Sequence, residues 1–205
     1  INKVGSICSG QMCNVIAQVA ALAGLNVVLN DISEDRLKSA MATINGNLSR
    51  QVVKKIITED ARKGALDRIV TAETMDGLAD CDLVIESAVE KEEVKRKIFH
   101  DLCAVLKPEA IVASNTSSIS ITRLAASTDR PEKFIGIHFM NPVPLMELVE
   151  LIRGIATDDS TFDASKEFVA RLGKQIAVSE DFPAFIVNRI LLPMINEAIY
   201  TLYEG

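Results

Sequence analysis

Residues 5–18, which read GSICSGQMCNVIAQ, have the layout of a loop that binds a dinucleotide pyrophosphate. Such a loop joins a strand to a helix and carries three glycines. The first makes the tight turn, the second lets the backbone approach the pyrophosphate, and the third lets the helix pack closely on the strand. The corresponding residues here are Cys8, Gly10 and Cys13. The loop alone therefore does not decide whether the chain binds a nicotinamide cofactor or only descends from a protein that did.

An acidic residue at the end of the second predicted strand favours cofactor binding. Asp31 lies 21 residues after Gly10 and closes the strand predicted over residues 26–29. A carboxylate at this place hydrogen-bonds the hydroxyls of the adenosine ribose and repels a 2′-phosphate, which selects NAD over NADP. The alternative is that Asp31 is a turn or capping residue before Ser33. We predict that it binds the ribose and that the cofactor is NAD.

Strand-like and helix-like segments alternate along the chain, which is typical of an α/β fold. Short apolar runs predict buried strands at residues 4–7, 26–29, 69–72, 83–87, 111–114, 134–139, 148–152 and 175–178. Helical patterns cover residues 12–23, 33–55, 58–66, 160–172 and 184–203. This order predicts a doubly wound, Rossmann-like, mostly parallel sheet with right-handed crossovers, which an αα excursion interrupts after the second strand.

The last predicted helix is apolar on more than one side, and a helix of this kind needs partners on several sides. Its apolar residues are Ile186, Ile190, Leu191, Met194, Ile195, Ile199 and Leu202. One sheet face cannot cover all of them. We therefore expect residues 1–183 to form an NAD-binding domain and residues 184–205 to be the first helix of a mostly absent all-α C-terminal domain. Cover by a partner chain is the alternative.

Composition argues against several classes of protein. The net charge of −6, with basic residues scattered among acids, argues against nucleic-acid binding. The apolar runs are too short to span a membrane, and the N-terminus has no secretion signal. Four cysteines without a CxxC pair and only two histidines predict no metal site and small buried thiols in a reducing compartment, hence a cytoplasmic protein.

Two further segments carry a resemblance to a known family. They are SNTSS at 114–118 and HFMNPVPLMELVE at 138–150, and FIVNR at 185–189 extends the match. With them the chain resembles the short-chain L-3-hydroxyacyl-CoA dehydrogenases, most closely the bacterial 3-hydroxybutyryl-CoA branch, over essentially its whole length. The resemblance implies NAD-dependent oxidation of a short-chain L-3-hydroxyacyl-CoA to a 3-ketoacyl-CoA. It also implies a homodimer formed through the C-terminal domain.

The resemblance assigns four catalytic residues. His138 matches the catalytic base, Glu150 its carboxylate partner, and Ser117 and Asn188 the residues that place the substrate oxygen. Alcohol oxidation needs a base for the hydroxyl proton; histidine in general titrates near neutral pH, and a carboxylate fixes its tautomer. The twelve-residue spacing of His138 and Glu150, with two prolines between, predicts a strand, a turn and a returning strand.

The resemblance also assigns residues to the cofactor and to coenzyme A. Glu90 and Lys95 match positions at the nicotinamide end, with an i,i+5 pair on a solvated helix as the alternative. The alternative for Asn115 is a loop-shaping role, in which its side chain bonds to local backbone. Lys54 matches a lysine that contacts the CoA phosphates, and the alternative is that it is only an exposed helix lysine. The complete expected cofactor set is Gly10, Gln11, Met12, Asp31, Glu90, Lys95, Asn115 and Asn141.

The chain departs from the family at positions where members usually carry glycine, namely Cys8, Cys13, Val15 and Ala184. A Cβ at a left-handed position costs about 1–2 kcal/mol. We expect Cys13 to push the helix away from the strand and weaken NAD binding, and a Cys8–Cys13 disulfide is a minor alternative. The altered glycine loop also raises the hypothesis of a homologue that no longer does catalysis. A third hypothesis, independent of these departures, is the dehydrogenase half of a larger multifunctional protein, because the chain has no flanking context.

Overall fold

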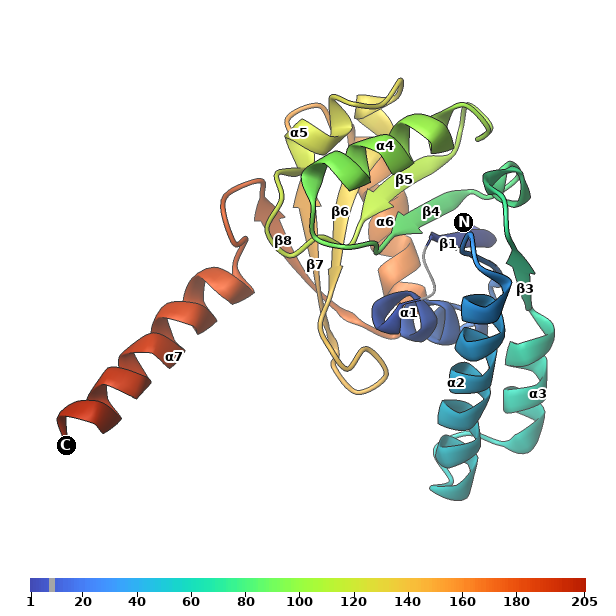
Figure 1. The fold of residues 1–205 in the computed structure, drawn as a ribbon, viewed down its shortest axis with the longest axis horizontal. Coiled ribbons are helices and arrows are strands. Elements are labelled where there is room, and N and C mark those ends of the chain that lie inside the picture. The colour runs from blue at the N-terminus through green and yellow to red at the C-terminus, as the bar shows by residue number, and fades with distance from the viewer. Residues whose placement is uncertain (8–9) are drawn as a thin grey trace.

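The computed structural model describes residues 1–7 and 10–205, and these residues contain a sheet of eight strands (Figure 1). The strand order is β3 (Ile69–Ala72), β2 (Asn26–Asn30), β1 (Lys3–Ile7), β4 (Leu83–Glu86), β5 (Ile111–Ser114), β6 (Phe134–Phe139), β7 (Leu148–Arg153) and β8 (Gln175–Glu180). Neighbours from β3 to β6 are parallel, β7 is antiparallel to β6, and β8 is parallel to β7. The predicted doubly wound, mostly parallel sheet is confirmed.

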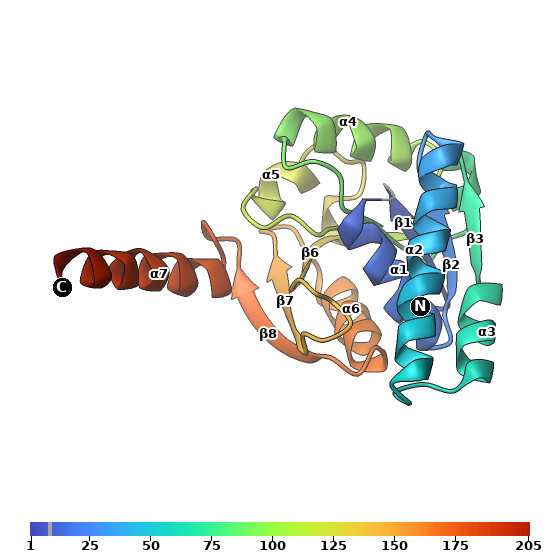
Figure 2. The ribbon, with the colours of Figure 1, turned by 60° about the horizontal axis from the view of Figure 1, so that its bottom comes forward.

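Helices cover both faces of this sheet (Figures 1 and 2). They are α1 (Gln11–Leu22), α2 (Glu34–Val53), α3 (Glu59–Asp67), α4 (Glu92–Cys103), α5 (Ile121–Ala125), α6 (Asp159–Arg171) and α7 (Val187–Glu204), with 3₁₀ turns at Met75–Leu78 and Pro131–Lys133. Buried residues of α1, α2 and α6 form one core with the sheet. Buried residues of α4 and α5 form a second core on the opposite face. The inner strands β1, β2 and β4–β7 are buried because helices cover both faces, which is why they read as continuous apolar runs. The edge strands β3 and β8 are largely exposed, which corrects the prediction of buried strands at residues 69–72 and 175–178.

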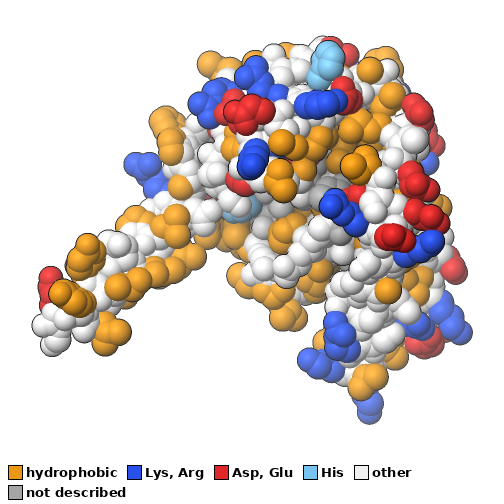
Figure 3. All heavy atoms as spheres, in the orientation of Figure 1, with side chains coloured by type: hydrophobic (Ala, Val, Ile, Leu, Met, Phe, Trp, Pro, Cys, Tyr) orange, Lys and Arg blue, Asp and Glu red, His pale blue; other side chains and the backbone are white. Residues whose placement is uncertain are grey.

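The helix α7 extends away from the sheet, and along it apolar side chains are exposed (Figures 1 and 3). None of its residues is buried within the described chain. Leu202 is 84% exposed and Ile190 is 63% exposed. The predicted helix is confirmed, and the rest of the described chain does not cover its apolar faces. None of the described helices combines the length and the hydropathy that a membrane span requires.

The helix α7 begins three residues later than the sequence pattern predicts, because two residues before it are left-handed. Ala184 has φ +67° and Phe185 has φ +51°. Just before them, the Asp181 carboxylate accepts hydrogen bonds from Ser120 Oγ at 2.6 Å and from the Ile121 backbone N–H at 2.9 Å. The chain is therefore fastened to α5 at Asp181 and then turns sharply into α7.

Replacing Ala184 with glycine should stabilise the protein by about 1 kcal/mol. Glycine adopts a positive φ without the steric cost that the alanine Cβ meets, and this gain exceeds the entropy that glycine adds to the unfolded chain. Urea unfolding would measure it. Ala104 is the matched control, because it lies at the end of α4 with φ −68°. Ala104→Gly should destabilise the protein, and equal effects of the two substitutions would contradict the argument.

Candidate active site

The antiparallel pairing of β6 and β7 places His138 directly opposite Glu150. His138 Nδ1 lies 2.7 Å from Glu150 Oε2, and both side chains are buried. The twelve-residue spacing thus corresponds to a strand, a turn and a returning strand, as the sequence predicts. Because the carboxylate accepts from Nδ1, the neutral imidazole keeps its proton there and leaves the Nε2 lone pair available as a base.

The second oxygen of Glu150 faces the start of α7. Glu150 Oε1 accepts hydrogen bonds from the backbone N–H groups of Ile186 at 2.9 Å and Val187 at 2.8 Å. Burial raises the pKa of this carboxyl, but the hydrogen bonds from His138, Val187 and Ile186 outweigh burial, so the pKa lies below its ordinary value. The ring of Phe185 also packs edge-on against the His138 ring, with 5.9 Å between centroids. The turn into α7 therefore helps to hold the histidine–carboxylate pair.

The lowered pKa of Glu150 predicts how the pair responds to acid. A carboxyl whose pKa is lower in the folded state stabilises the fold above its unfolded-state pKa, about 4.3, and loses that contribution as the pH falls towards the folded value. The free energy of unfolding of the unsubstituted protein should exceed that of Glu150→Gln at neutral pH, and the difference should shrink below about pH 4. Urea unfolding across this range measures it. Glu147→Gln, at an exposed position, is the control, and a difference independent of pH would contradict the prediction.

The second ring nitrogen of His138, Nε2, contacts Ser117. Ser117 Oγ lies 3.1 Å from His138 Nε2, and the Asn188 side-chain N–H group donates to the Ser117 carbonyl at 3.5 Å. The four residues expected to be catalytic come from β6, β7, α7 and the loop after β5, and they lie together. A hydroxyl, an imidazole and a carboxylate in this order can take a proton from an alcohol held near Ser117.

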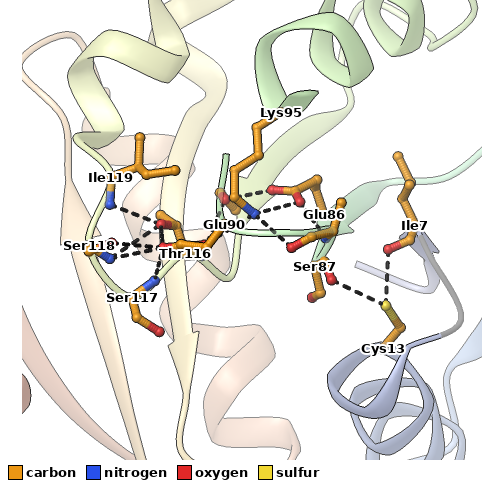
Figure 4. A network of polar contacts seen from close by, with 12 residues as sticks. Ile7, Cys13, Glu86, Ser87, Glu90, Lys95, Thr116, Ser117, Ser118 and Ile119 are labelled. Carbon is orange, nitrogen blue, oxygen red and sulfur yellow. Dashed lines mark hydrogen bonds and ion pairs between the residues drawn. The ribbon is translucent and has the colours of Figure 1, made fainter. Parts of the chain in front are cut away.

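The loop that carries Ser117 is bound to Glu90 (Figure 4). Glu90 Oε1 accepts hydrogen bonds from the Thr116 hydroxyl, from the Ser117 N–H at 3.0 Å and from the Ser118 N–H at 3.2 Å. Burial raises the pKa of Glu90, but these hydrogen bonds and nearby Lys95 outweigh it and lower the pKa. Glu90 therefore acts here as an ionised acceptor for the loop.

Lys95 is not on a solvated helix face, so the alternative of an i,i+5 pair with Glu90 on a solvated helix is wrong. Its side chain is 1% exposed, and its Nζ lies 2.7 Å from Oε1 of the fully buried Glu86. The contact with Glu90 is longer, at 3.5 Å. Sequence reasoning missed Glu86. The available signal was one acidic residue at the end of the otherwise apolar strand Leu83–Glu86.

Asn115 bridges two strands and does not bond local backbone, contrary to its loop-shaping alternative. Its side-chain Oδ1 accepts from the backbone N–H of Phe139 at 2.9 Å, and the backbone N–H of Asn115 donates to the Glu86 carbonyl at 2.8 Å. Thr116 does shape the loop locally, because its Oγ1 accepts from the N–H groups of Ser118 at 3.3 Å and Ile119 at 3.0 Å. Asn115, directly after β5, therefore joins the carboxyl ends of β4 and β6, next to His138.

The start of α1 fits the pyrophosphate of a dinucleotide. Gly10 is the N-cap residue and supplies no side-chain cap, and the first turn contains no acidic residue. The N-termini of α2 and α3 differ, because Ser33 and Thr58 cap them and acidic residues follow. The positive end of the α1 dipole is thus not offset by a carboxylate in its first turn, which suits an anion. Gln11 begins the helix, and Met12 packs against the core.

Cys13 occupies the position of the third glycine, where α1 packs on the sheet, and its expected effect on NAD binding stays a prediction. Its side chain is fully buried. Its Sγ lies 3.1 Å from the Ile7 carbonyl oxygen and 3.7 Å from that of Ser87, so the thiol contacts the ends of β1 and β4 (Figure 4). Cys8, and with it the hypothesis of a Cys8–Cys13 disulfide, lies outside the described residues.

A groove at the end of β2 suits the adenosine half of the cofactor. Ile7, Asp31, Ile32, Arg36 and Val89 are among the residues that line it. Asp31 is buried, and its Oδ1 accepts from the Ser33 N–H at 3.0 Å, so the turn role that was the alternative for Asp31 is present. Its Oδ2 lies 3.9 Å from Nη1 of Arg36, which is largely exposed. The carboxylate lies beside the groove, as ribose binding requires.

A second groove lies between α1, α2 and the β6–β7 turn. Gln11, Arg50, Lys54, Asn141 and Leu145 are among its lining residues. Lys54 is exposed at the end of α2, so it is an exposed helix lysine that also faces a groove. Arg50, one turn earlier, is a second cation that the sequence analysis did not single out. Two cations on one wall suit the phosphates of a nucleotide tail.

Comparison with known proteins gives the family. The model of the 3-hydroxyacyl-CoA dehydrogenase NAD-binding domain matches residues 3–182. The chain belongs to the 3-hydroxyacyl-CoA dehydrogenase family. Its cofactor is NAD, and its activity is the NAD-dependent oxidation of a 3-hydroxyacyl-CoA. The hypothesis of a homologue that has lost catalysis is not favoured.

Individual members of the 3-hydroxyacyl-CoA dehydrogenase family match this chain over its whole length. It is 83% identical over 205 residues to the 3-hydroxybutyryl-CoA dehydrogenase of Bradyrhizobium diazoefficiens and covers 70% of that protein. The crystal structure of (S)-3-hydroxybutyryl-CoA dehydrogenase from Ralstonia eutropha superposes with a TM-score of 0.97 at 47% identity, covering all of this chain and 72% of that one. A 3-hydroxybutyryl-CoA dehydrogenase structure from Escherichia coli has a TM-score of 0.96 at 39% identity, over all of this chain and 43% of that one.

Proposed function

We propose that the preferred substrate of this 3-hydroxyacyl-CoA dehydrogenase is a short-chain L-3-hydroxyacyl-CoA, such as 3-hydroxybutyryl-CoA. The observation that carries the catalytic part is the continuous contact from Ser117 Oγ through His138 to Glu150 Oε2. The short chain length is supported by the names of the relatives from Bradyrhizobium diazoefficiens and Ralstonia eutropha.

We propose that His138 is the base. Its Nε2 takes the proton of the substrate 3-hydroxyl, since Glu150 holds the other ring proton at Nδ1. Glu150 then stabilises the imidazolium that forms, as an ionised carboxylate with a lowered pKa. Ser117 and Asn188 position the substrate oxygen in front of Nε2. NAD, when bound, supplies the acceptor for the hydride that leaves C3.

The expected cofactor residues divide into those proposed to contact NAD and two proposed to support its nicotinamide end. We propose that Gly10, Gln11, Met12 and the first turn of α1 receive the pyrophosphate, that Asp31 binds the adenosine ribose, and that Asn141 lies near the nicotinamide ribose. Glu90 reaches the nicotinamide end. Lys95 and Asn115 are buried and bonded within the protein, so we propose that they support this end from behind.

We propose that Lys54 binds the phosphates of coenzyme A, supported by its place beside Arg50 in the groove at the β6–β7 turn. Residues 1–183 would form the NAD-binding domain and residues 184–205 the first helix of an α-helical domain. The end of the family match at residue 182 and the exposed apolar faces of α7 support this division. A cytoplasmic homodimer that binds neither nucleic acid nor membrane completes the proposal, and sedimentation of the full-length protein tests the dimer.

The decisive assay is oxidation of NADH by acetoacetyl-CoA with the full-length protein. We expect a rate that depends on His138 and that falls as the acyl chain of the 3-ketoacyl-CoA lengthens. No rate above background would refute the catalytic proposal. A rate that rises with chain length would leave the catalytic residues intact and refute the short-chain preference.

A further inference from the structure

Three charged residues, on β4, on α4 and on the segment between them, form a network that the proton transfer does not use. The network consists of Glu86, Lys95 and Glu90, and we call it the Glu86 network (Figure 4). We propose that Glu86 is a positioning residue which, through Lys95 and Glu90, holds the Ser117 hydroxyl against His138. This inference rests on the catalytic roles proposed above for Ser117 and His138.

The buried end of the network joins three elements. Glu86 is the last residue of β4 and is fully buried. Its Oε1 lies 2.7 Å from Nζ of Lys95, on α4, and its Oε2 accepts from Oγ of Ser114 at 2.8 Å, at the end of β5. Glu86 therefore fixes the ends of two strands and one helix relative to each other, directly before the loop that carries Ser117.

Lys95 connects Glu86 to Glu90. Its Nζ also donates to the Ala88 carbonyl at 3.2 Å, which ties back the segment between β4 and α4. The same Nζ lies 3.5 Å from Glu90 Oε2. The lysine therefore contacts one carboxylate oxygen of Glu90, while the other oxygen, Oε1, is directed to the loop.

Glu90 holds the loop through three successive residues. One oxygen accepts from the backbone N–H groups of Ser117 and Ser118 and from the hydroxyls of Thr116 and Ser118. The backbone of Ser117 is thus fixed by Glu90, and its side chain points to His138 Nε2 at 3.1 Å. A displacement of Glu90 would move the hydroxyl out of hydrogen-bonding range.

Because the Glu86–Lys95 ion pair is buried, we infer that its main role is not to stabilise the fold. Lys95 and Glu86 have side-chain exposures of 1% and 0%. Taking two such charges out of water costs several kcal/mol, and apolar residues of the same volume often stabilise a fold equally well or better. Glu90, with 41% exposure, is the end of the network that reaches the open site. A rigid, buried anchor with one exposed end is what positioning of the loop requires.

The test is a double-mutant cycle in the full-length enzyme. Glu86→Gln with Lys95→Met removes both buried charges, and glutamine can still bond Ser114 while methionine fills the lysine volume. We expect kcat for acetoacetyl-CoA reduction to fall by about 10- to 100-fold, with KM for both substrates within about threefold. Ser117→Ala should lower kcat in the otherwise unchanged enzyme but have little further effect in this background.

The control and the alternatives separate positioning from general stabilisation. Lys97→Met with Asp101→Asn removes an exposed ion pair of 2.5 Å from the same helix and should leave kcat unchanged. Glu90→Gln, at an exposed position, weakens the outer end of the network, and the cycle with Ser117→Ala is repeated in this background if the first pair of substitutions prevents folding. An unchanged kcat, or the same factor for Ser117→Ala in both backgrounds, would overturn the inference. If Ser117→Ala has no effect in the unsubstituted enzyme, the proposed role of Ser117 itself fails.

Discussion

His138→Ala should lower kcat for acetoacetyl-CoA reduction by about 10³- to 10⁴-fold and leave the affinity for NADH nearly unchanged. General acid–base groups contribute about 10²- to 10⁴-fold, and this histidine bonds both Ser117 and Glu150, so its loss disconnects the whole proton path. Alanine also leaves a buried carboxylate without one of its partners, which places the effect near the upper end. Steady-state kinetics and calorimetric titration with NADH would measure the two quantities.

The second histidine of the chain is the matched control. His100 is exposed on α4, on the opposite side of the sheet from α1, and it takes no part in the site. His100→Ala should therefore leave kcat within about twofold, as surface substitutions usually do. A comparable loss of activity in both variants would show that the histidine at β6 is not the base.

The family resemblance implies the pairing of His138 with Glu150, and the spacing predicts the adjacent antiparallel strands that bring the two residues together. A strand of residues 134–139, a turn rich in proline and a strand from residue 148 leave little freedom of register, and the pairing of Gly136 with Ile152 follows from the same register. The alternation of strands and helices is predictable for a different reason, because each inner strand is buried and is read directly from its apolar run.

The polar contacts behind the site are not predictable in this way. The Lys95–Glu86 pair crosses from α4 to β4, and no local pattern distinguishes a buried lysine from the exposed lysines around it. The amides of Ile186 and Val187 bind Glu150 only because Ala184 and Phe185 are left-handed, a conformation that their residue types do not favour. In both cases tertiary packing overrides local preference.

The contacts of Cys13 are not predictable from its volume alone, and its effect on NAD binding stays a prediction. A cysteine in place of the third glycine adds a side chain between helix and strand, which suggests displacement. The thiol lies instead against the carbonyl oxygens of Ile7 and Ser87, so its added volume is accommodated in polar contact at the strand ends. Close packing of α1 is thus compatible with a small side chain that can donate a weak hydrogen bond.

Asp31→Asn should raise the ratio of NADP affinity to NAD affinity by about 10³-fold. Asparagine keeps the Oδ1 acceptor for the Ser33 N–H, so the turn is preserved, but the negative charge is lost. Losing a charged hydrogen bond to the ribose costs about 1.5–3 kcal/mol of NAD affinity. Removal of the carboxylate also ends its repulsion of a 2′-phosphate, and it leaves Arg36, 3.9 Å away, available to bind that phosphate.

Arg36 supplies the internal test of this prediction. In the Asp31→Asn background, Arg36→Ala should remove the gain in NADP affinity while leaving the weakened NAD affinity nearly unchanged. Asp35→Asn, an equal change of charge at an exposed position in the first turn of α2, is the control and should leave the NADP to NAD ratio unaltered. Calorimetric titration with both cofactors measures each Kd. If Asp31→Asn weakens both cofactors equally, the carboxylate does not select between them and the prediction is wrong.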